Sequence, residues 1–420
     1  MPPLFGYHGA CLRIDLGART SERLELPHDV LRRYIGGSGL GAWLLRRETP
    51  GSAAAGDVRD ALAPEMPVVV SFSPLVGTPL TTSAKFAMLA KSPLTGRIND
   101  SLSSSHFAIA GKKTGYDAFV IVGAADRPSC LVIEPEGMRV VPADDLWGLS
   151  AEATGERLRE RLGPGFRIAA IGLAGEQQVR YATVSHDGRH AGRGGLGAVL
   201  GCKRLKAIAV RGDVLTPVAD PDALVAYARE LSQLSFGPAT EKYRELGTIS
   251  NLLTFNRLGT LPTRNFQQGT FAAAERLSPE SLERQFPRTR KSCAACTIGC
   301  EHIFHSPGKS GGGVRMEYEN LVALGPMCGI EDPDMVLAAS RLCDEYGLDT
   351  ISAGGTIAFA MECVERGLLD APELRFGSGE AVLTTLRLIA RREGVGELLS
   401  QGVREAARRI GGGAESFAMH

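Results

Sequence analysis

The chain has 420 residues, a formal net charge of zero and 44% hydrophobic residues. These values exclude a disordered chain and a protein that holds nucleic acid through bulk positive charge, and they predict a soluble globular protein. The length favours two domains.

The first residues, "MPPLFGYHGACLRIDLG", lack a basic segment followed by an apolar core, so we predict no signal peptide. Because no uncharged apolar run reaches the roughly 18 residues of a membrane span, we expect a cytoplasmic protein with no membrane partner. Nine cysteines in such a protein favour metal ligands or buried thiols over disulfides.

The first half of the chain contains β-branched runs separated by glycine and proline, which predict strands. These runs are "PVVVSFSP" (67–74), "DAFVIVGA" (117–124), "CLVIEP" (130–135), "FRIAAIG" (166–172) and "LKAIAVRG" (205–212). Residues 1–212 are therefore predicted to form a β-sheet domain.

The second half changes character near Asp213, where an amphipathic helix is predicted over 220–234. Helical patterns recur at 316–325, 333–346, 350–366, 378–393 and 396–410. The expected fold class is therefore α+β, with a sheet domain followed by a mostly helical domain over 213–420.

The segment "YIGGSGLGAWLL" (34–45) is a weak match to a dinucleotide-binding loop, since no clear strand precedes it, and a plain turn explains it equally well. The segment "TTSAKFAMLAKSPLTGRINDS" (81–101) contains Lys85 and Lys91. These lysines could face a bound anion or lie on a solvated strand face.

The segment "AGRGGLGAVLGCKRLKAIAV" (191–210) combines flexible backbone with cations. The residues that suit a phosphate group are Arg193, Gly194, Lys203 and Lys206. The alternative is a helix that packs closely on the sheet through Gly197 and Gly201.

The segment "KSCAACTIGCEH" (291–302) contains a C-x2-C-x3-C run made by Cys293, Cys296 and Cys300. Thiolate sites commonly need four ligands, so these could hold an iron–sulfur cluster with a distant fourth cysteine. They could also form a zinc site with His302 and His305, or be core thiols.

Two acidic motifs lie at predicted helix ends. Glu319 opens an apolar helix, and "DEYGLD" (344–349) places Asp344 and Asp349 around a glycine. Ordinary helix capping explains both motifs, whereas the functional alternative is a carboxylate pair that binds a polar heterocycle.

Together these segments resemble the tungsten-containing aldehyde:ferredoxin oxidoreductases, in that family's order and over essentially the whole chain. The matching motifs are "YIGGSGLGAWLL", "KSPLTGR" (91–97), "KKTGYDAFVIVG" (112–123), "AGRGGLGAVLGCK", "NRLGTLPTRNF" (256–266), "CAACTIGC", "EYENLVALGPMCGI" and "DEYGLDTISAG" (344–354).

The resemblance implies a first domain of two sheets over a bis-pterin cofactor that chelates tungsten or molybdenum. It further implies Mg²⁺ between the pterin phosphates and a [4Fe–4S] cluster beside one pterin. The implied reaction converts a small aldehyde and water into a carboxylic acid and passes electrons to ferredoxin or another electron-transfer protein.

The resemblance also assigns roles by position. The implied cluster ligands are Cys293, Cys296 and Cys300. The implied pterin-binding residues are Asp344, Gly347, Leu348 and Asp349, with Arg193 and Gly194 near the phosphates. Glu319 matches a proton-transfer residue, and Lys85 stands where the family commonly has an arginine between cluster and pterin.

This chain departs from the family in three respects, one of which is that "SLSSSHF" (101–107) replaces a more glycine-rich family stretch near the implied Mg²⁺ site. Lysine cannot make the forked contact of arginine. The family has a third domain, expected to be missing here, whose D-x-x-G-L-C motif supplies the fourth cluster ligand. The alternatives are a truncated or split-gene fragment that is inactive alone and a catalytic subunit related to tungsten benzoyl-CoA reductase. The possible protein partners include a second copy in a homodimer or a separate C-terminal subunit.

Overall fold

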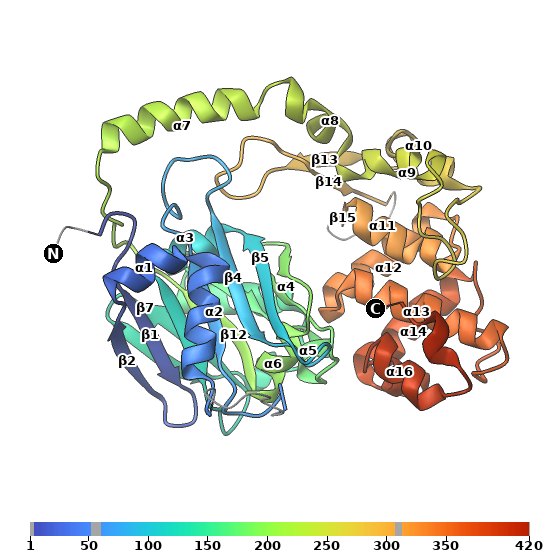
Figure 1. Cartoon of the computed structure of the whole chain (residues 1–420), viewed down its shortest axis with the longest axis horizontal. Helices are drawn as coiled ribbons and strands as arrows, with labels where there is room; N and C mark the ends of the chain where they lie inside the picture. Colours follow the sequence, from blue (N-terminus) through green and yellow to red (C-terminus); the bar gives the residue numbers. More distant parts are fainter. Residues whose placement is uncertain (1–3, 52–59, 307–312, 420) are drawn as a thin grey trace. The chain divides into compact units, whose positions relative to one another are not determined.

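The computed structural model describes residues 4–51, 60–306 and 313–419, and it divides into two compact units (Figure 1). The first unit extends to Leu234 and includes the short segment Cys293–Cys296. The second contains Ser235–Ser292 and the chain from Thr297 onwards. The predicted α+β class is confirmed, because strands dominate the first unit and helices the second.

Two six-stranded sheets form the first unit. The first sheet has the order β2 (Thr20–Glu25), β1 (Ala10–Asp15), β6 (Ala118–Val122), β3 (Val68–Phe72), β4 (Lys85–Lys91) and β5 (Ile98–Ser104). The second has the order β11 (Arg189–Ala191), β10 (Val184–His186), β9 (Arg167–Ala170), β12 (Leu205–Val210), β7 (Ser129–Glu134) and β8 (Gly137–Pro142). Each of the five predicted strand segments overlaps one of these strands, and β7 begins one residue before its predicted segment.

The two sheets share one core, in which Phe86 and Met88 of the first sheet cluster with Ile208 and Val184 of the second. Helices cover the outer faces. Apolar residues of α2 (Gly37–Glu48) pack on the first sheet, and those of α4 (Ala151–Leu162) pack on the second. Strands buried on both faces need continuous apolar runs, which explains why β3 and β12 have no polar alternation.

The remaining helices of the first unit are α1 (His28–Tyr34), α3 (His106–Lys112), α5 (Leu173–Glu176) and α6 (Leu196–Cys202). Helix α7 (Pro221–Ser235) reaches the point at which the chain passes into the second unit. Gly36, at the start of α2, lies against β3, since a Cβ there would be 2.7 Å from the Phe72 carbonyl oxygen. This glycine segment therefore has a packing role.

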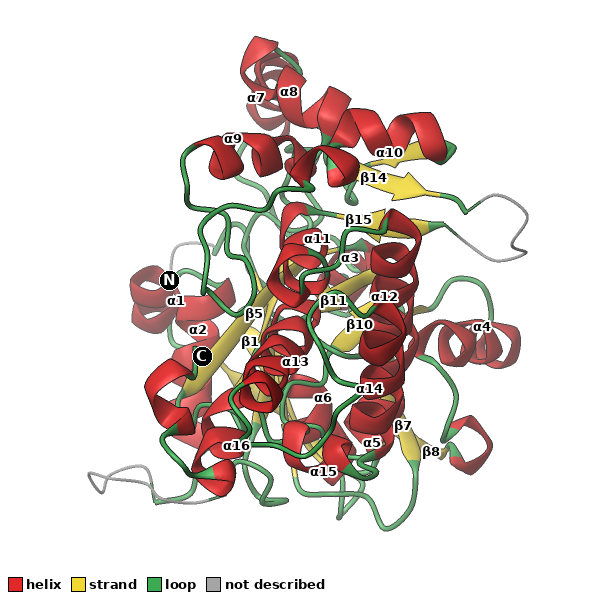
Figure 2. Ribbon diagram, turned by 90° about the vertical axis from the view of Figure 1, so that its right-hand side faces the viewer, coloured by secondary structure: helices red, strands yellow, loops and turns green. Residues whose placement is uncertain are grey.

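The second unit is mostly helical (Figure 2). Its helices are α8 (Pro238–Leu246), α9 (Leu252–Arg257), α10 (Pro279–Gln285), α11 (Tyr318–Leu324), α12 (Pro333–Tyr346), α13 (Thr350–Glu365), α14 (Gly379–Arg391), α15 (Val395–Leu399) and α16 (Val403–Ile410). A three-stranded sheet contains β13 (Arg288–Lys291), β14 (Glu301–Phe304) and β15 (Val314–Met316).

One helix prediction was wrong in detail. The single helix expected over 396–410 is two helices, α15 and α16, because Gly402 adopts a φ of 83° between them. Among the described residues, no helix is both long enough and apolar enough to span a membrane.

Candidate functional site

The segment Cys293–Cys296 packs with the sheet unit, near the start of β4. The Cys296 N–H donates to the Cys293 carbonyl at 3.1 Å, and the Thr82 N–H donates to the Ala295 carbonyl at 2.5 Å. Ala295 and Thr82 both have left-handed backbone, with φ of 51° and 63°. Such conformations persist only where surrounding contacts hold them. This contact therefore fixes the segment three residues before Lys85.

The loop of Arg193 and Gly194 is held against β5 by its backbone carbonyls. The Arg193 carbonyl accepts hydrogen bonds from Asn99 Nδ2 and Ser101 Oγ, both at 3.0 Å, and the Gly194 carbonyl accepts one from Ser92 Oγ at 2.8 Å. Gly194 has a φ of 85°, and a Cβ there would lie 2.0 Å from Asn99 Oδ1. Only glycine fits at this position.

The ribbon of β4 and β5 carries or adjoins three segments that were predicted to belong to the site. Lys85 pairs with Ser104 at one end of β5, and Ser101 holds the Arg193 loop about 10 Å away along the same strand. The Lys85 and Arg193 side chains are both exposed. Lys85 and the contacts of the Arg193 loop therefore lie on β4 and β5, and the Cys293–Cys296 segment contacts the residues that lead into β4.

Sequence reasoning missed the residues that hold this loop, namely Ser92, Asn99 and Ser101. A signal was available, because Asn99, Ser101 and Ser103 alternate along β5 and therefore share one face of the strand. Polar side chains on one face of a strand indicate that this face meets polar groups.

Two lysines that were predicted to bind a phosphate group are instead buried and bond to other groups of the protein. Lys203 and Lys206 have 0% exposure. Lys203 Nζ donates to the carbonyls of Pro64 and Gly123, while Lys206 forms an ion pair with Glu176. The structure thus corrects the expectation for these two lysines.

The close helix packing predicted for the same segment is present. A Cβ on Gly197 would lie 2.4 Å from the Thr183 carbonyl oxygen, and one on Gly201 would lie 1.9 Å from that of Gly175. Helix α6 therefore needs both glycines to pack against its neighbours.

In the helical unit, the start of α11 lies beside α12. Asn320 Nδ2 donates to Ser340 Oγ at 2.8 Å, and Asn320 Oδ1 accepts from the Glu317 N–H in a capping box. Ser340 is one helical turn before Asp344, so the start of α11 meets the helix that leads to the acidic motif. The Glu319 side chain is exposed at this start.

The acidic motif connects α12 to α13, and its residues have structural roles at this junction. Gly347 ends α12 in left-handed conformation with a φ of 73°, and Leu348 is buried. The Asp349 carboxylate caps α13 by accepting from the Ile351 and Ser352 N–H groups at 3.2 and 3.3 Å. Asp344 is half-buried in the last turn of α12. Capping is thus a demonstrated role of Asp349, and pterin binding stays a prediction.

The nine cysteines fall into two classes. Cys202, Cys293, Cys296 and Cys300 are half-buried, whereas Cys11, Cys130, Cys328, Cys343 and Cys363 are buried. Burial raises the pKa of Cys11, Cys130, Cys328 and Cys363 to about 12, that of Cys202 to about 11, and that of Cys343 well above its usual value. Because metal ligands must be thiolates, the six thiols with a raised pKa are the poorer candidates, and cluster binding by Cys293, Cys296 and Cys300 stays a prediction.

Both ring nitrogens of His302 are hydrogen-bonded within the protein, which argues against the zinc alternative. Its ring has 1% exposure, its Nε2 donates to the Arg244 carbonyl at 3.1 Å, and its Nδ1 accepts from Arg288 at 3.2 Å. Burial lowers the pKa of His302, which favours this neutral form. Across the described ranges, no three His, Cys, Asp or Glu side chains are grouped closely enough to hold a metal ion.

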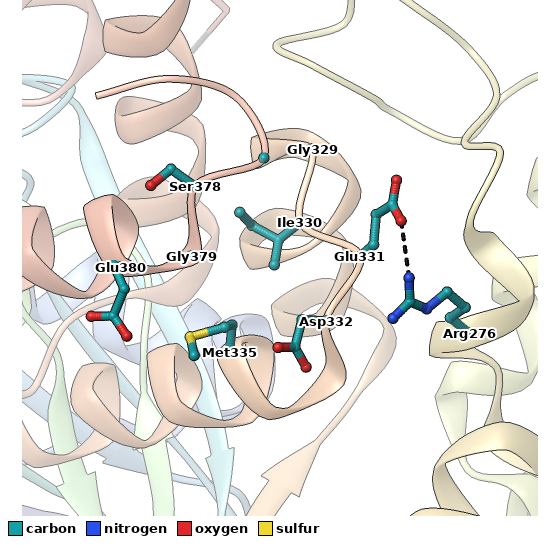
Figure 3. Close-up of a pocket in the computed structure, with 10 residues that line it drawn as sticks. Arg276, Gly329, Ile330, Glu331, Asp332, Met335, Ser378, Gly379 and Glu380 are labelled. Carbon is teal, nitrogen blue, oxygen red and sulfur yellow. Dashed lines mark hydrogen bonds and ion pairs between the residues drawn. The ribbon is translucent and has the colours of Figure 1, made fainter. Parts of the chain in front are cut away.

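A cavity of about 380 Å³ lies in the helical unit, between the starts of α12 and α14 (Figure 3). Its lining includes Glu331, Asp332 and Glu380, and Arg276 forms an ion pair with Glu331 at 3.1 Å. None of the site residues predicted from the sequence lines it. This cavity is therefore separate from the candidate site.

Comparisons with known proteins agree with the motif resemblance. Family models for the N-terminal domain and for domains 2 and 3 of aldehyde ferredoxin oxidoreductase match residues 11–212 and 226–420. The tungsten-containing aldehyde ferredoxin oxidoreductase of Pyrococcus abyssi is 37% identical over 97% of this chain and 68% of its own length. The WOR-like subunit of an aliphatic sulfonate oxidoreductase of Pyrococcus furiosus is 29% identical over the same shares.

A solved structure is also similar, namely the active-site complex BamBC of benzoyl-coenzyme A reductase with 1,5-dienoyl-CoA. It matches with a TM-score of 0.85 and 28% identity, over 99% of this chain and 65% of that chain. The chain thus spans about two thirds of the length of these relatives.

Proposed function

Because this chain belongs to the aldehyde ferredoxin oxidoreductase family, we propose that it oxidises an aldehyde to a carboxylic acid with a tungsten or molybdenum bis-pterin. In this reaction the aldehyde C–H bond breaks, a C–O bond to the water oxygen forms, and two electrons and two protons leave. The chemistry that the metal–pterin and a [4Fe–4S] cluster supply when bound is two-electron acceptance followed by one-electron release to ferredoxin.

The observation that best supports this proposal is the continuity of the β4–β5 ribbon. It connects the Cys293–Cys296 segment, through Lys85, to the loop of Arg193 and Gly194. A pathway from a pterin to a cluster needs this kind of rigid support, because strands position side chains more precisely than loops do.

Each predicted residue then has a role in the proposal. The cluster would be held by Cys293, Cys296 and Cys300, and the pterin by Asp344, Gly347, Leu348 and Asp349. The loop of Arg193 and Gly194 would face the pterin phosphates with their Mg²⁺, and Lys85 would lie between pterin and cluster. Glu319 would take the proton from the water that adds to the aldehyde.

The test begins with metal analysis and turnover of the chain purified from cells supplied with iron and tungstate. We expect about one tungsten and about four irons per chain, together with aldehyde-dependent reduction of methyl viologen. A chain with both metals that oxidises none of a panel of aliphatic and aromatic aldehydes would contradict the proposed substrate class. A chain with neither metal would favour a binding module that needs another subunit.

Glu319→Gln is the specific variant. We expect normal tungsten and iron content with turnover reduced by about 10²–10⁴-fold, because a general base is lost. Glu380→Gln is the matched control, since Glu380 is another exposed carboxylate in the first turn of a helix. Unchanged turnover in Glu319→Gln would rule out the proton-transfer role.

The second candidate substrate is a cyclic dienoyl-CoA, favoured by the similarity to the benzoyl-coenzyme A reductase complex over 99% of this chain. The same metal-loaded protein can be offered 1,5-dienoyl-CoA with methyl viologen. Viologen reduction with this substrate, and none with aldehydes, would favour the second candidate.

A further inference from the structure

Strand β13 is an exposed, basic edge strand that directly precedes the cysteine run. Among the described strands it pairs only with β14, so its other edge has no neighbouring strand in the part of the chain that the structure describes. Its sequence is RTRK, and Thr289, Arg290 and Lys291 are exposed. The Arg290 side chain is 43% exposed, and its carboxylate neighbour, Glu245, is 3.6 Å away. Lys291 forms no ion pair with any residue in the described parts of the chain.

An exposed aromatic ring is held beside this strand. The Phe236 side chain is 53% exposed, and the guanidinium of Arg244 lies 4.2 Å from its ring centroid. Arg244 is 8% exposed, and its carbonyl lies 3.5 Å from Arg290 Nη1. The buried arginine therefore links the ring to the strand and holds both in place. Exposed aromatic and arginine side chains are typical of protein–protein interfaces.

The same strand lies beside the third cysteine. A Cβ on Gly299 would be 3.2 Å from Ser292 Oγ and 3.6 Å from Arg290 Nε, and Gly299 directly precedes Cys300. Along the chain, Lys291 is two residues from Cys293, which limits their Cα separation to about 7 Å. Ser235, next to Phe236, is hydrogen-bonded to Thr297 inside the cysteine run at 2.6 Å.

From these observations we infer that Phe236, Arg290 and Lys291 form the β13 surface, on which an acidic iron–sulfur electron carrier docks. The inference rests on the proposed function, in which electrons leave through the cluster that the three cysteines would hold. A docked carrier must approach the cluster closely, and the β13 surface is an exposed part of the chain close to Cys300.

Charge favours an acidic partner. The cations around the strand are Arg244, Arg288, Arg290 and Lys291, and the carboxylates are Glu245, Glu283 and the buried Glu301. Arg290 and Lys291, two of the three exposed strand positions, are both positive. A positive surface attracts a negatively charged carrier and raises its association rate, an effect that salt weakens.

The test compares two electron acceptors with the metal-loaded full chain. Methyl viologen is small and needs no docking surface, whereas a small acidic [4Fe–4S] ferredoxin does. For the double variant Arg290→Glu, Lys291→Glu we expect kcat/KM with ferredoxin to fall by about ten-fold or more at low salt. The rate with methyl viologen should stay unchanged, and the salt dependence of the ferredoxin reaction should flatten.

Two further variants make the result specific. Phe236→Ala should weaken the ferredoxin reaction without changing its salt dependence, because it removes apolar contact and no charge. Arg387→Glu, on the exposed side of α14, should leave both acceptors unaffected. Unchanged ferredoxin kinetics in the double variant, or an equal loss with methyl viologen, would overturn the docking surface.

Direct binding separates this inference from the proposed reaction. If the wild-type chain turns over no aldehyde, ferredoxin binding to the full chain is measured by isothermal titration calorimetry. Binding that the double variant loses and Arg387→Glu retains supports the β13 surface even though the reaction is different. Equal binding by the wild type and the double variant, or none by the wild type, overturns it.

Discussion

At the scale of single residues, Lys203 shows how the fold uses charge away from the candidate site. Its ammonium is fully buried and donates to the carbonyls of Pro64 and Gly123. Burial lowers its pKa from 10.5 to about 8. Desolvation therefore outweighs the opposing electrostatic interactions with Cys202, Glu65 and Asp15, which raise the pKa.

This lowered pKa predicts a pH dependence of stability. Between about pH 8 and 10.5 the unfolded state binds more protons at Lys203 than the folded state, so the free energy of unfolding should rise with pH. The expected contribution is at most about 3 kcal/mol. The free energies of unfolding of the wild type and of Lys203→Met are measured by urea denaturation at several pH values. The contribution of Lys203 is the difference between the slopes of these free energies against pH. Parallel slopes would show that Lys203 does not titrate in this range.

A second residue-scale prediction concerns the two classes of cysteine. Cys296→Ser should lower the iron content of the purified chain markedly, because a half-buried ligand is lost. Cys130→Ala should leave iron content unchanged, since burial keeps that thiol protonated. Iron analysis together with the visible absorption of the cluster provides the measurement. Equal iron in both variants would contradict the assignment of ligands.

At the scale of elements, the sequence predicted those structures whose signal is local. Continuous apolar runs located β3 and β12, and the apolar periodicity located α12 and α13. The break between α15 and α16 was missed, because Gly402 interrupts a helical pattern that otherwise continues. The bonds from Asn99 and Ser101 to Arg193 were missed for a different reason. They join residues more than ninety positions apart, and no local pattern encodes such a contact.

For the candidate site too, the sequence predicted the local motifs but not the contacts between distant residues. The cysteine run and the acidic motif were visible as residue types at fixed spacings, and the motifs identified the family. The burial of Lys203 and Lys206 was not visible, because a lysine near glycines has the same sequence pattern whether it binds a phosphate or a carbonyl. Only the tertiary neighbours distinguish the two.

Helix α13 allows a matched pair of predictions at adjacent positions. A Cβ on Gly354 would lie 2.2 Å from the Ala323 carbonyl oxygen of α11, whereas one on Gly355 would have no neighbour within 4 Å. Gly354→Ala should therefore lower the free energy of unfolding by about 1–3 kcal/mol. Gly355→Ala should raise it by up to about 1 kcal/mol through helix propensity. Chemical denaturation measures both, and a destabilised Gly355→Ala variant would show that the space beside it is filled.

At the scale of the whole molecule, stability is distributed unevenly. Helix α7 has one buried residue, Ala228, in fifteen positions, whereas α13 has ten buried residues in sixteen. A helix of this length without a packed face is marginally stable in water. The helix that leads from one unit to the other is thus the least supported of the long helices in the described chain.

Hydrogen exchange with mass spectrometry tests this difference directly. The amides of α7 should exchange much faster than those of α13, a helix of similar length in the same molecule. Equal protection of the two helices would mean that α7 is covered in solution.

The hydrogen bond between Thr82 and Ala295 has a consequence for biosynthesis. These residues lie at opposite ends of a long stretch of chain, yet both belong to the sheet unit. During translation the strands of that unit emerge first and can pair before the cysteine segment has been made. The cysteines then join a sheet that is already folded. In the proposed function, iron loading would therefore be a late step in maturation, after the ribosome has passed the helical segments α7 to α10.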